Sequence, residues 1–448
     1  MNVISALKHR LSSRPDLKRI AENIAWLFFD KILRMGVGLF VGAWVARYLG
    51  PEQFGQLNYA TAFISLFGAF VALGLKGIVI RDIVRSPEET GSILSTSFFM
   101  QLFGAVAAIA VALVAIGCLR PDDDQMRALV AVVSLSLLFK TSDIIKYWYE
   151  SQVQSRYTVW VENGAFLLMA CVKVAMVITR APLLAFAWVF LMEAVLVAAG
   201  LFAVYLRREK RLHSWVPGFE HARELLKDSY PLLIASISIV AYMEADKVML
   251  GEMVGEEEVG IYGVAARISE IWYFIPMTIN VSLQPLLFKL RETSYEQYKL
   301  RLQQSLNLMI WLSVPIAFGV SAGAGFIIDT LFGEMYSRSA EVLVVHVWAG
   351  VFVFLNNVTW TWYIAESKQD LVNIRMIVGL LLNIGLNYVL ISDFGALGAA
   401  YATLISRSFI AYFGHLMNRE TRVLFYMMSR SMLSLGFYKM RIKNSGLG

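Results

Sequence analysis

Long apolar stretches alternate with short polar segments along almost the whole chain. The stretches at 92–117 and 305–328 contain no charged residue. Each is long enough to cross a hydrocarbon core of about 30 Å as a helix, which takes roughly 20 residues. Backbone groups at that depth must hydrogen-bond internally, so helices are the expected form. The pattern predicts twelve spans, at residues 23–48, 57–80, 92–117, 126–145, 158–179, 182–206, 229–251, 261–288, 305–328, 341–364, 376–391 and 396–417.

The basic residues between these spans fall almost entirely on one side. If the N-terminus is cytoplasmic, the cytoplasmic loops and tails hold 27 Lys and Arg and the external loops hold 3. Cytoplasmic loops are normally enriched in these residues, so the count supports both the span number and an orientation with both termini inside. The net charge of +6 therefore faces the anionic inner leaflet rather than a nucleic acid.

A weak internal repeat divides the twelve spans into two groups of six. At an offset of 205, the segment 49–60 matches 254–265 through the pairs Gly50 and Gly255, Glu52 and Glu257, Gly55 and Gly260, and Ala60 and Ala265. Both segments follow the first span of their group, and the longest basic loop lies between the groups. Because six is even, the halves share one orientation and form a parallel repeat. Transporters built in this way place the ligand between the halves.

The predicted fold class is therefore an all-α membrane protein with twelve transmembrane helices in two six-helix lobes. The predicted divisions are a cytoplasmic amphipathic N-terminus at 1–22, an N-lobe at 23–206, a cytoplasmic linker at 207–228, a C-lobe at 229–417 and a basic cytoplasmic tail at 418–448.

Charged residues inside the predicted spans point to function. Ten Lys or Arg lie there, with seven Asp or Glu besides Glu341 at the very start of a span, although a charge at mid-helix costs ~2.5–3.5 kcal/mol on insertion scales. Spacing pairs Asp30 with Arg34, Lys140 with Asp143, and Arg267 with Glu270 on shared helix faces. These pairs can simply neutralise one another. The excess of cations, however, favours an anionic ligand such as phosphate.

Catalytic and metal-binding patterns are weak. Cys118 and Cys171 have no disulfide or zinc spacing, and His346 and His415 stand alone. The acidic pair Glu244-Ala-Asp246 lies mid-span, whereas membrane glycosyltransferases carry such a pair in an external loop. The interpretation is that the chain is not an enzyme and needs no cofactor or metal.

Five segments together resemble the Wzx-type polysaccharide flippases, the polysaccharide exporter family of the multidrug/oligosaccharidyl-lipid/polysaccharide flippase superfamily. They are residues 46–55, 74–82, 259–267, 331–343 and 395–403. The resemblance covers roughly residues 20–420 and implies a fold like that of the MATE extruders, with a cationic central cavity. In the related lipid II flippases, arginines of the first and eighth helices line the cavity. Arg267 matches the eighth-helix position, and Lys31 and Arg34 fall in the matching region of the first helix.

The resulting hypothesis is a flippase of the bacterial inner membrane. It would move an isoprenoid-diphosphate-linked oligosaccharide, such as an O-antigen or exopolysaccharide repeat unit, to the outer leaflet by ion-coupled alternating access. Its expected partners are this substrate, membrane lipid, a glycan polymerase and a chain-length regulator, and no nucleic acid. Candidate substrate-binding residues are Lys31, Arg34, Lys247, Arg267, Lys140, Lys173 and Arg407, and candidates for charge pairing or coupling are Asp30, Asp143, Asp246 and Glu270.

Two alternatives stay open at this point. One is a multidrug or toxin extruder driven by Na⁺ or H⁺, whose cationic substrates would need a pocket dominated by acids. The other is a non-transporting scaffold of a glycan-assembly complex.

Overall fold

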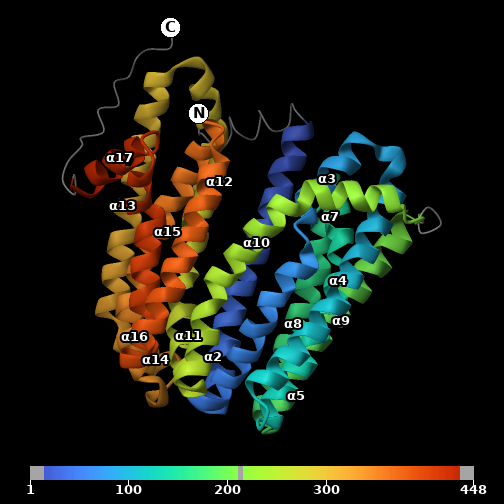
Figure 1. Cartoon of the computed structure of the whole chain (residues 1–448), viewed down its shortest axis with the longest axis vertical. Coiled ribbons are helices and arrows are strands. Elements are labelled where there is room, and N and C mark those ends of the chain that lie inside the picture. The colour runs from blue at the N-terminus through green and yellow to red at the C-terminus, as the bar shows by residue number, and fades with distance from the viewer. Residues whose placement is uncertain (1–14, 210–214, 434–448) are drawn as a thin grey trace, which may run out of the picture. The chain divides into compact units, whose positions relative to one another are not determined.

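The computed structural model describes residues 15–209 and 215–433, and every regular element within these ranges is a helix (Figure 1). The all-α fold class is confirmed. Within these ranges, nine helical stretches are long and apolar enough to cross a membrane. Two of them each contain a residue with non-helical backbone angles, Gly50 in α2 (Pro15–Ala72) and Gly395 in α16 (Gln369–Ala411). Each of these stretches therefore covers two predicted spans, whereas α10 (Phe219–Met253), a further predicted span, is not among the nine. The count of twelve stays a prediction.

The chain forms two compact units. The first contains the residues up to Val264 together with Asp329–Tyr336, and the second contains Ala265–Ile328 and the residues from Ser337 onward. α10 and the first part of α11 (Glu256–Glu270) belong to the first unit. The predicted boundary between six-helix lobes stays a prediction, since it follows the sequence repeat rather than compactness.

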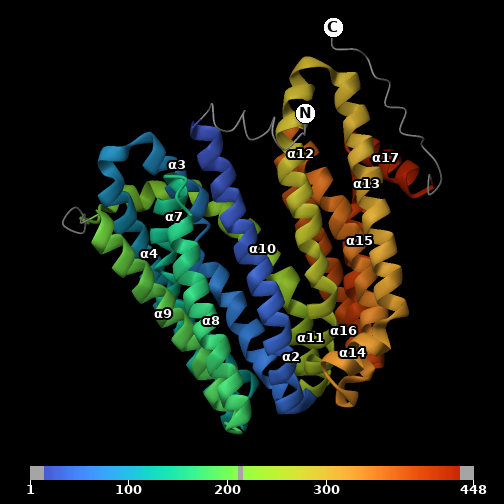
Figure 2. The same ribbon diagram turned by 180° about the vertical axis from the view of Figure 1, so that it is seen from behind.

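The long helices of the first unit are α2, α10, α4 (Thr90–Leu119), α8 (Arg156–Ile178) and α9 (Leu183–Glu209). Figure 2 shows the two arms of α2 in dark and lighter blue, and Gly50 separates them in the sequence. The shorter elements of this unit are α3 (Leu75–Arg85), η1 (Pro87–Glu89), α5 (Asp124–Ser134), α6 (Ser136–Lys140), α7 (Asp143–Ser151) and η4 (Glu334–Tyr336).

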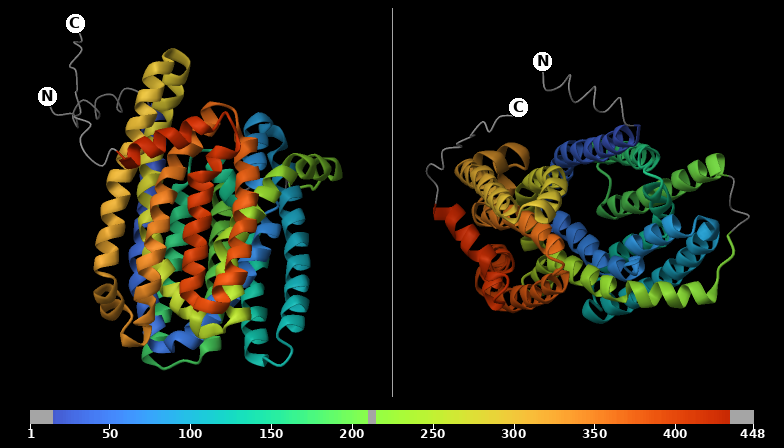
Figure 3. Two further views of the ribbon diagram at one scale, coloured as in Figure 1. Left: turned by 60° about the vertical axis from the view of Figure 1, so that its left-hand side comes forward. Right: turned by 90° about the horizontal axis from the view of Figure 1, so that it is seen from above.

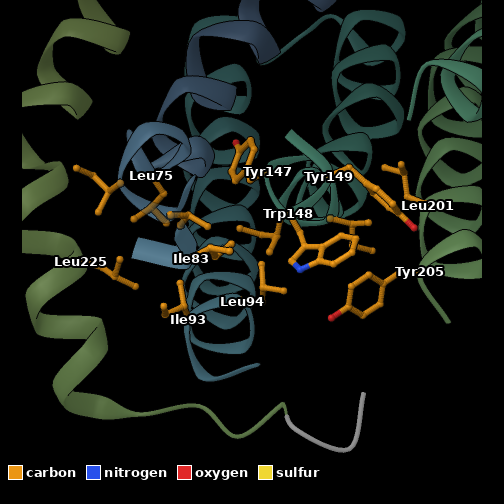
Figure 4. Close-up of a cluster of buried hydrophobic side chains, with 14 residues drawn as sticks. Leu75, Ile83, Ile93, Leu94, Tyr147, Trp148, Tyr149, Leu201, Tyr205 and Leu225 are labelled. Atoms are coloured by element: carbon orange, nitrogen blue, oxygen red, sulfur yellow. The ribbon is translucent and has the colours of Figure 1, made fainter. Parts of the chain in front are cut away.

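A cluster of buried apolar and aromatic side chains fixes one end of the first unit. Figure 4 shows Leu75 and Ile83 of α3 facing Trp148 of α7, with Tyr205 of α9 beyond it. The Trp148 and Tyr205 rings pack edge to face with centroids 5.7 Å apart, a favoured aromatic geometry. This packing holds the short helix α7 against its neighbours, and α7 carries two charged residues of the candidate site.

The second unit is built on α12 (Phe274–Thr293), α13 (Tyr295–Ala322), α15 (Arg338–Ala365) and α16, with α14 (Ala324–Leu331) contributing most of its length. Two short elements link its helices, η3 (Ile271–Tyr273) and η5 (Phe413–Met417). Figure 3 shows the amphipathic helix α17 (Arg422–Leu433) lying across the long helices. Gln303 of α13 donates hydrogen bonds to Ser431 Oγ and the Met427 carbonyl oxygen, at 2.7 and 2.9 Å. These bonds fix α17 to α13.

Helices extend into segments that the sequence predicts as loops. α9 continues to Glu209 and α10 begins at Phe219, so both enter the predicted linker. α17 lies in the predicted tail. Helices can continue past the bilayer into water, where the backbone still bonds internally. Most of the predicted N-terminal segment and the end of the tail lie outside the described residues.

Candidate functional site

The first arm of α2 carries an acid and a base one helical turn apart. Asp30 Oδ1 accepts a 2.7 Å hydrogen bond from Arg34 Nε, so this predicted pair is confirmed. The guanidinium also lies over the Phe166 ring, 5.2 Å from its centroid. Arg34 Nη2 is buried and makes no hydrogen bond within the described part of the chain. Asp30 thus fixes the guanidinium through Nε, while Nη2 has no hydrogen-bond acceptor among the described residues.

Glu162 of α8 extends this pair into a network across three helices. Its Oε2 lies 4.0 Å from Arg34 Nη2, and its Oε1 accepts a 2.8 Å hydrogen bond from Lys146 Nζ. Lys146 Nζ also lies 2.7 Å from Asp143 Oδ1. We call Asp30, Arg34, Glu162, Lys146 and Asp143 the charge network. With three carboxylates and two cations, it carries a net charge of −1 when every member is ionised.

Lys140 does not form the predicted pair with Asp143. The backbone keeps helical angles through Thr141 and Ser142, but Asp143 pairs with Lys146 instead. Lys140 Nζ instead donates to the Gly68 carbonyl oxygen at 3.5 Å, and no described carboxylate lies within ion-pair distance of it. Lys140 and Lys31 are both exposed on the first unit.

Two further candidate lysines are held by acids. Lys173 Nζ lies 3.9 Å from Glu193 Oε2 and 4.8 Å from the Phe190 ring centroid. Lys247 Nζ donates to Glu244 Oε2 at 2.7 Å, one turn away on α10. These two lysines therefore already have acidic partners, and a ligand would have to compete with them.

Asp246 is almost completely buried, with 3% of its surface exposed. It accepts a 2.6 Å hydrogen bond from the Tyr262 hydroxyl of α11. A buried carboxylate needs such a donor, because removal from water otherwise costs several kcal/mol. This bond ties α10 to α11.

The second unit contains the remaining candidates. Arg267 and Glu270 lie three residues apart on the continuous helix α11, within electrostatic range of each other. Arg407 of α16 lies over the Tyr273 ring, 5.3 Å from its centroid.

Lys146 was not among the predicted site residues, because it falls just past the predicted span 126–145. Glu162 lies inside the predicted span 158–179 but was not among them either. The spacing of Asp143 and Lys146 is that of an ion pair within α7, and this signal identifies Lys146 once α7 is recognised as helical.

A second overlooked residue is Arg375, which is only 4% exposed although it was counted in a loop. Its Nη1 donates to the Tyr363 hydroxyl at 2.8 Å and lies 2.7 Å from His415 Nδ1. His415 is fully buried, and these contacts give its ring a structural role in packing.

Solved structures define the class of fold. A multidrug resistance MATE family transporter of the MOP superfamily in an inward-facing conformation aligns with a TM-score of 0.72 and 15% identity, over 92% of this chain and all of the other. The lipid II flippase MurJ aligns with a TM-score of 0.71 and 14% identity, over 92% of this chain and 91% of MurJ. The fold is thus that of an all-α membrane transporter.

Residues 20–291 match the family model described as polysaccharide biosynthesis protein, and residues 231–389 match the MatE model. The first match covers more than half of the sequence, so the chain belongs to the polysaccharide biosynthesis protein family, and the resemblance noted in the sequence is confirmed.

Two relatives from Haloferax volcanii are each 24% identical. "Probable flippase AglR" matches over 87% of this chain and 81% of its own length. "Probable low-salt glycan biosynthesis flippase Agl15" matches over 42% of this chain, and this match spans 40% of its own length.

Proposed function

We propose that the chain is a flippase that moves an oligosaccharide linked to an isoprenoid diphosphate from the inner to the outer leaflet by alternating access. Family membership and the two relatives named as flippases support transport of a lipid-linked glycan. The substrate would be an O-antigen or exopolysaccharide repeat unit. The protein would span a cytoplasmic membrane many times with both termini inside, next to a glycan polymerase and a chain-length regulator.

The observation that carries this proposal is the partly held guanidinium of Arg34. Asp30 fixes its orientation through Nε, while Nη2 has no hydrogen-bond acceptor among the described residues. A planar guanidinium recognises phosphate oxygens through two parallel bonds. Arg34 would therefore bind the diphosphate, and the exposed Lys31 and Lys140 of the same unit would add positive charge.

The other candidates have lesser roles in this proposal. Lys173 and Lys247 already face acids, so either would have to exchange a carboxylate for the substrate. Arg267 and Arg407 are proposed anion ligands of the second unit, with Glu270 orienting Arg267. Asp246 would be structural, because its hydrogen-bond donor is a buried tyrosine hydroxyl.

Ion coupling would use the acids of the charge network. Asp30 and Glu162 approach Arg34 from two sides, and Asp143 shares Lys146 with Glu162. A proton or metal cation on one of these carboxylates would change how firmly Arg34 and Lys146 are held. Binding of the coupling ion and of the diphosphate would then be linked through the same two cations.

The test compares Arg34→Ala and Arg34→Lys in cells that lack the chromosomal copy of this gene. A hydrogen bond to a charged group is worth about 1.5–3 kcal/mol, so Arg34→Ala should lower surface glycan per inserted protein about tenfold or more. Arg34→Lys keeps the charge but loses the two parallel hydrogen bonds of the guanidinium, and should give an intermediate amount of surface glycan. Arg127→Ala, which removes an exposed cation paired with Asp124, is the matched control and should have no effect.

A second measurement identifies the passenger directly. Native mass spectrometry of the wild-type protein should show a bound diphosphate-linked oligosaccharide, with less of it on Arg34→Ala. Normal surface glycan in Arg34→Ala at normal protein level would exclude Arg34 as a diphosphate ligand. Normal glycan in the deletion strain would refute the flippase itself.

A further inference from the structure

The repeated segments meet at the end of the first unit that the sequence predicts to lie outside. Gly50 and Gly255, which the offset of 205 equates, both have positive φ angles, of 73° and 107°. Residues with a Cβ atom rarely adopt such angles, so each glycine allows the chain to turn before the following helical segment. The second arm of α2 begins just after the first turn, and α11 begins just after the second.

These two helical segments cross in direct backbone contact. A Cβ atom on Gly55 would lie 1.7 Å from the Glu256 carbonyl oxygen, and one on Gly260 would lie 2.0 Å from the Pro51 carbonyl oxygen. The same offset converts Gly55 into Gly260 and Pro51 into Glu256. The two contacts are therefore reciprocal, as in a two-fold symmetric interface. A side chain at either glycine would collide with the other segment, so the two segments pack backbone against backbone at these points.

Arg120, just beyond the end of α4, fastens the crossing. Its Nε donates to Glu252 Oε1 at 3.1 Å, its Nη1 to Glu256 Oε1 at 2.9 Å, and its Nη2 to the Gly251 carbonyl oxygen at 2.5 Å. The guanidinium also lies 5.5 Å from the centroid of the Tyr59 ring. One side chain thus joins the end of α10, the start of α11 and the second arm of α2.

The guanidinium of Arg120 is held in its charged form by its carboxylate partners. Burial acts to lower its pKa, but the hydrogen bond and charge of Glu252, with the charge of Glu256, raise the pKa overall. The Tyr59 hydroxyl donates a 2.5 Å hydrogen bond to Glu252 Oε1 as well. We call Arg120, Glu252, Glu256 and Tyr59 the latch. About one fifth of the Arg120 side chain is exposed, so water can solvate the guanidinium if the latch opens.

A second arginine at this end is held differently. Arg47 Nη2 donates to the carbonyl oxygens of Asp329 and Thr330, near the end of α14, at 3.1 and 2.6 Å. The Tyr336 hydroxyl donates to the Ala46 carbonyl oxygen at 2.8 Å. These acceptors are backbone groups, whereas two of the three acceptors of Arg120 are carboxylates on side chains that can rotate away. Arg120 is therefore the better candidate for a contact that opens and closes.

We propose that Arg120 is a positioning residue for transport, which holds the predicted outer end of the first unit closed until the passenger leaves. This inference rests on the proposed flippase function. The glycine crossing itself is backbone packing, and the latch adds the side-chain hydrogen bonds that must break when it separates. The hydrogen bonds of Arg120 must break in the same step, and they set the closed population. Weakening them should open the outer end more often without altering the charge network.

The test measures access from outside to a cysteine placed beyond the crossing. Ser65 is partly buried on the second arm of α2, ten residues or about 15 Å past Gly55. Ser65→Cys is introduced into a chain whose Cys118 and Cys171 are serines, and a membrane-impermeant maleimide is added outside. Arg120→Ala should raise the labelling rate about tenfold, since charge-assisted hydrogen bonds are lost.

Conservative and matched variants separate a latch from a general structural role. Arg120→Lys keeps one charge-assisted bond and should give an intermediate labelling rate. Arg127→Ala lies at the predicted external end of the span 126–145 and should leave the labelling rate unchanged. An exposed reporter, Asp122→Cys, should label equally in all variants, which confirms the predicted side and the integrity of the loop.

An unchanged Ser65→Cys labelling rate in folded Arg120→Ala would overturn the proposal. If that variant fails to insert, Glu256→Gln removes one of the two carboxylate acceptors and is judged by the same rate. The labelling requires no glycan. Faster labelling together with normal surface glycan in the deletion strain would therefore refute the flippase function and leave the latch standing.

Discussion

Neutralising Glu162 should strengthen the binding of a diphosphate to the first unit. Glu162 Oε2 lies 4.0 Å from Arg34 Nη2, so a phosphate on the far side of that nitrogen would lie about 7 Å from the carboxylate. At an effective dielectric constant of roughly 20–40, two unit negative charges at this distance repel by about 1–2 kcal/mol. Glu162→Gln removes this repulsion, which corresponds to roughly five- to thirtyfold tighter binding. Lys146 keeps Asp143 as a partner, so the network stays assembled.

The assay is calorimetric titration of the detergent-solubilised protein with geranyl diphosphate. Glu193→Gln is the matched control, since Glu193 and Glu162 have equally exposed side chains and each lies about 4 Å from a cation. Tighter binding only in Glu162→Gln supports the location of the anion site. Equal tightening in both variants would indicate a general charge effect. Unchanged or weaker binding in folded Glu162→Gln would refute the placement of the diphosphate beside Arg34.

A further prediction concerns stability. Tyr262→Phe removes a hydrogen-bond donor to buried Asp246 and should lower the free energy of unfolding by about 1–3 kcal/mol, as measured by denaturant titration. The control Tyr388→Phe, at a tyrosine that is 71% exposed, should have little effect. Equal losses of stability in both variants would contradict the assigned bond.

The sequence predicts the class of fold well because the bilayer restricts the choice. A charge-free stretch such as 92–117 has no alternative to a helix, and α4 spans it. Boundaries were harder to predict, because Gly50 bends the chain inside one continuous run of helix. The repeat in the sequence assigns α10 to the second half of the chain, whereas the contacts in the folded structure place it in the first unit. Contacts between helices distant in sequence decide this grouping, and a repeat does not reveal them.

The candidate site was predictable only where neighbours in sequence are neighbours in space. Asp30 and Arg34 fulfil this condition because their helix is continuous. Lys140 and Asp143 do not pair, because Asp143 also has Lys146 three residues away and binds that lysine. The link from Arg34 to Glu162 joins α2 to α8, and no spacing rule reaches across 128 positions. Tertiary contacts of this kind decide which charges are available to a ligand.

The reciprocal glycine crossing also bears on how such a chain could arise. If two identical six-helix polypeptides met at this crossing, one mutation to glycine would have removed both steric clashes at once, because a symmetric interface repeats every change. In the present single chain, Gly55 and Gly260 are separate codons, and each faces its own carbonyl oxygen. A side chain at either position would clash with a backbone carbonyl group, and the glycine at the other position would not relieve that clash. Fusion of the halves thus converts one inherited requirement into two that must be maintained independently.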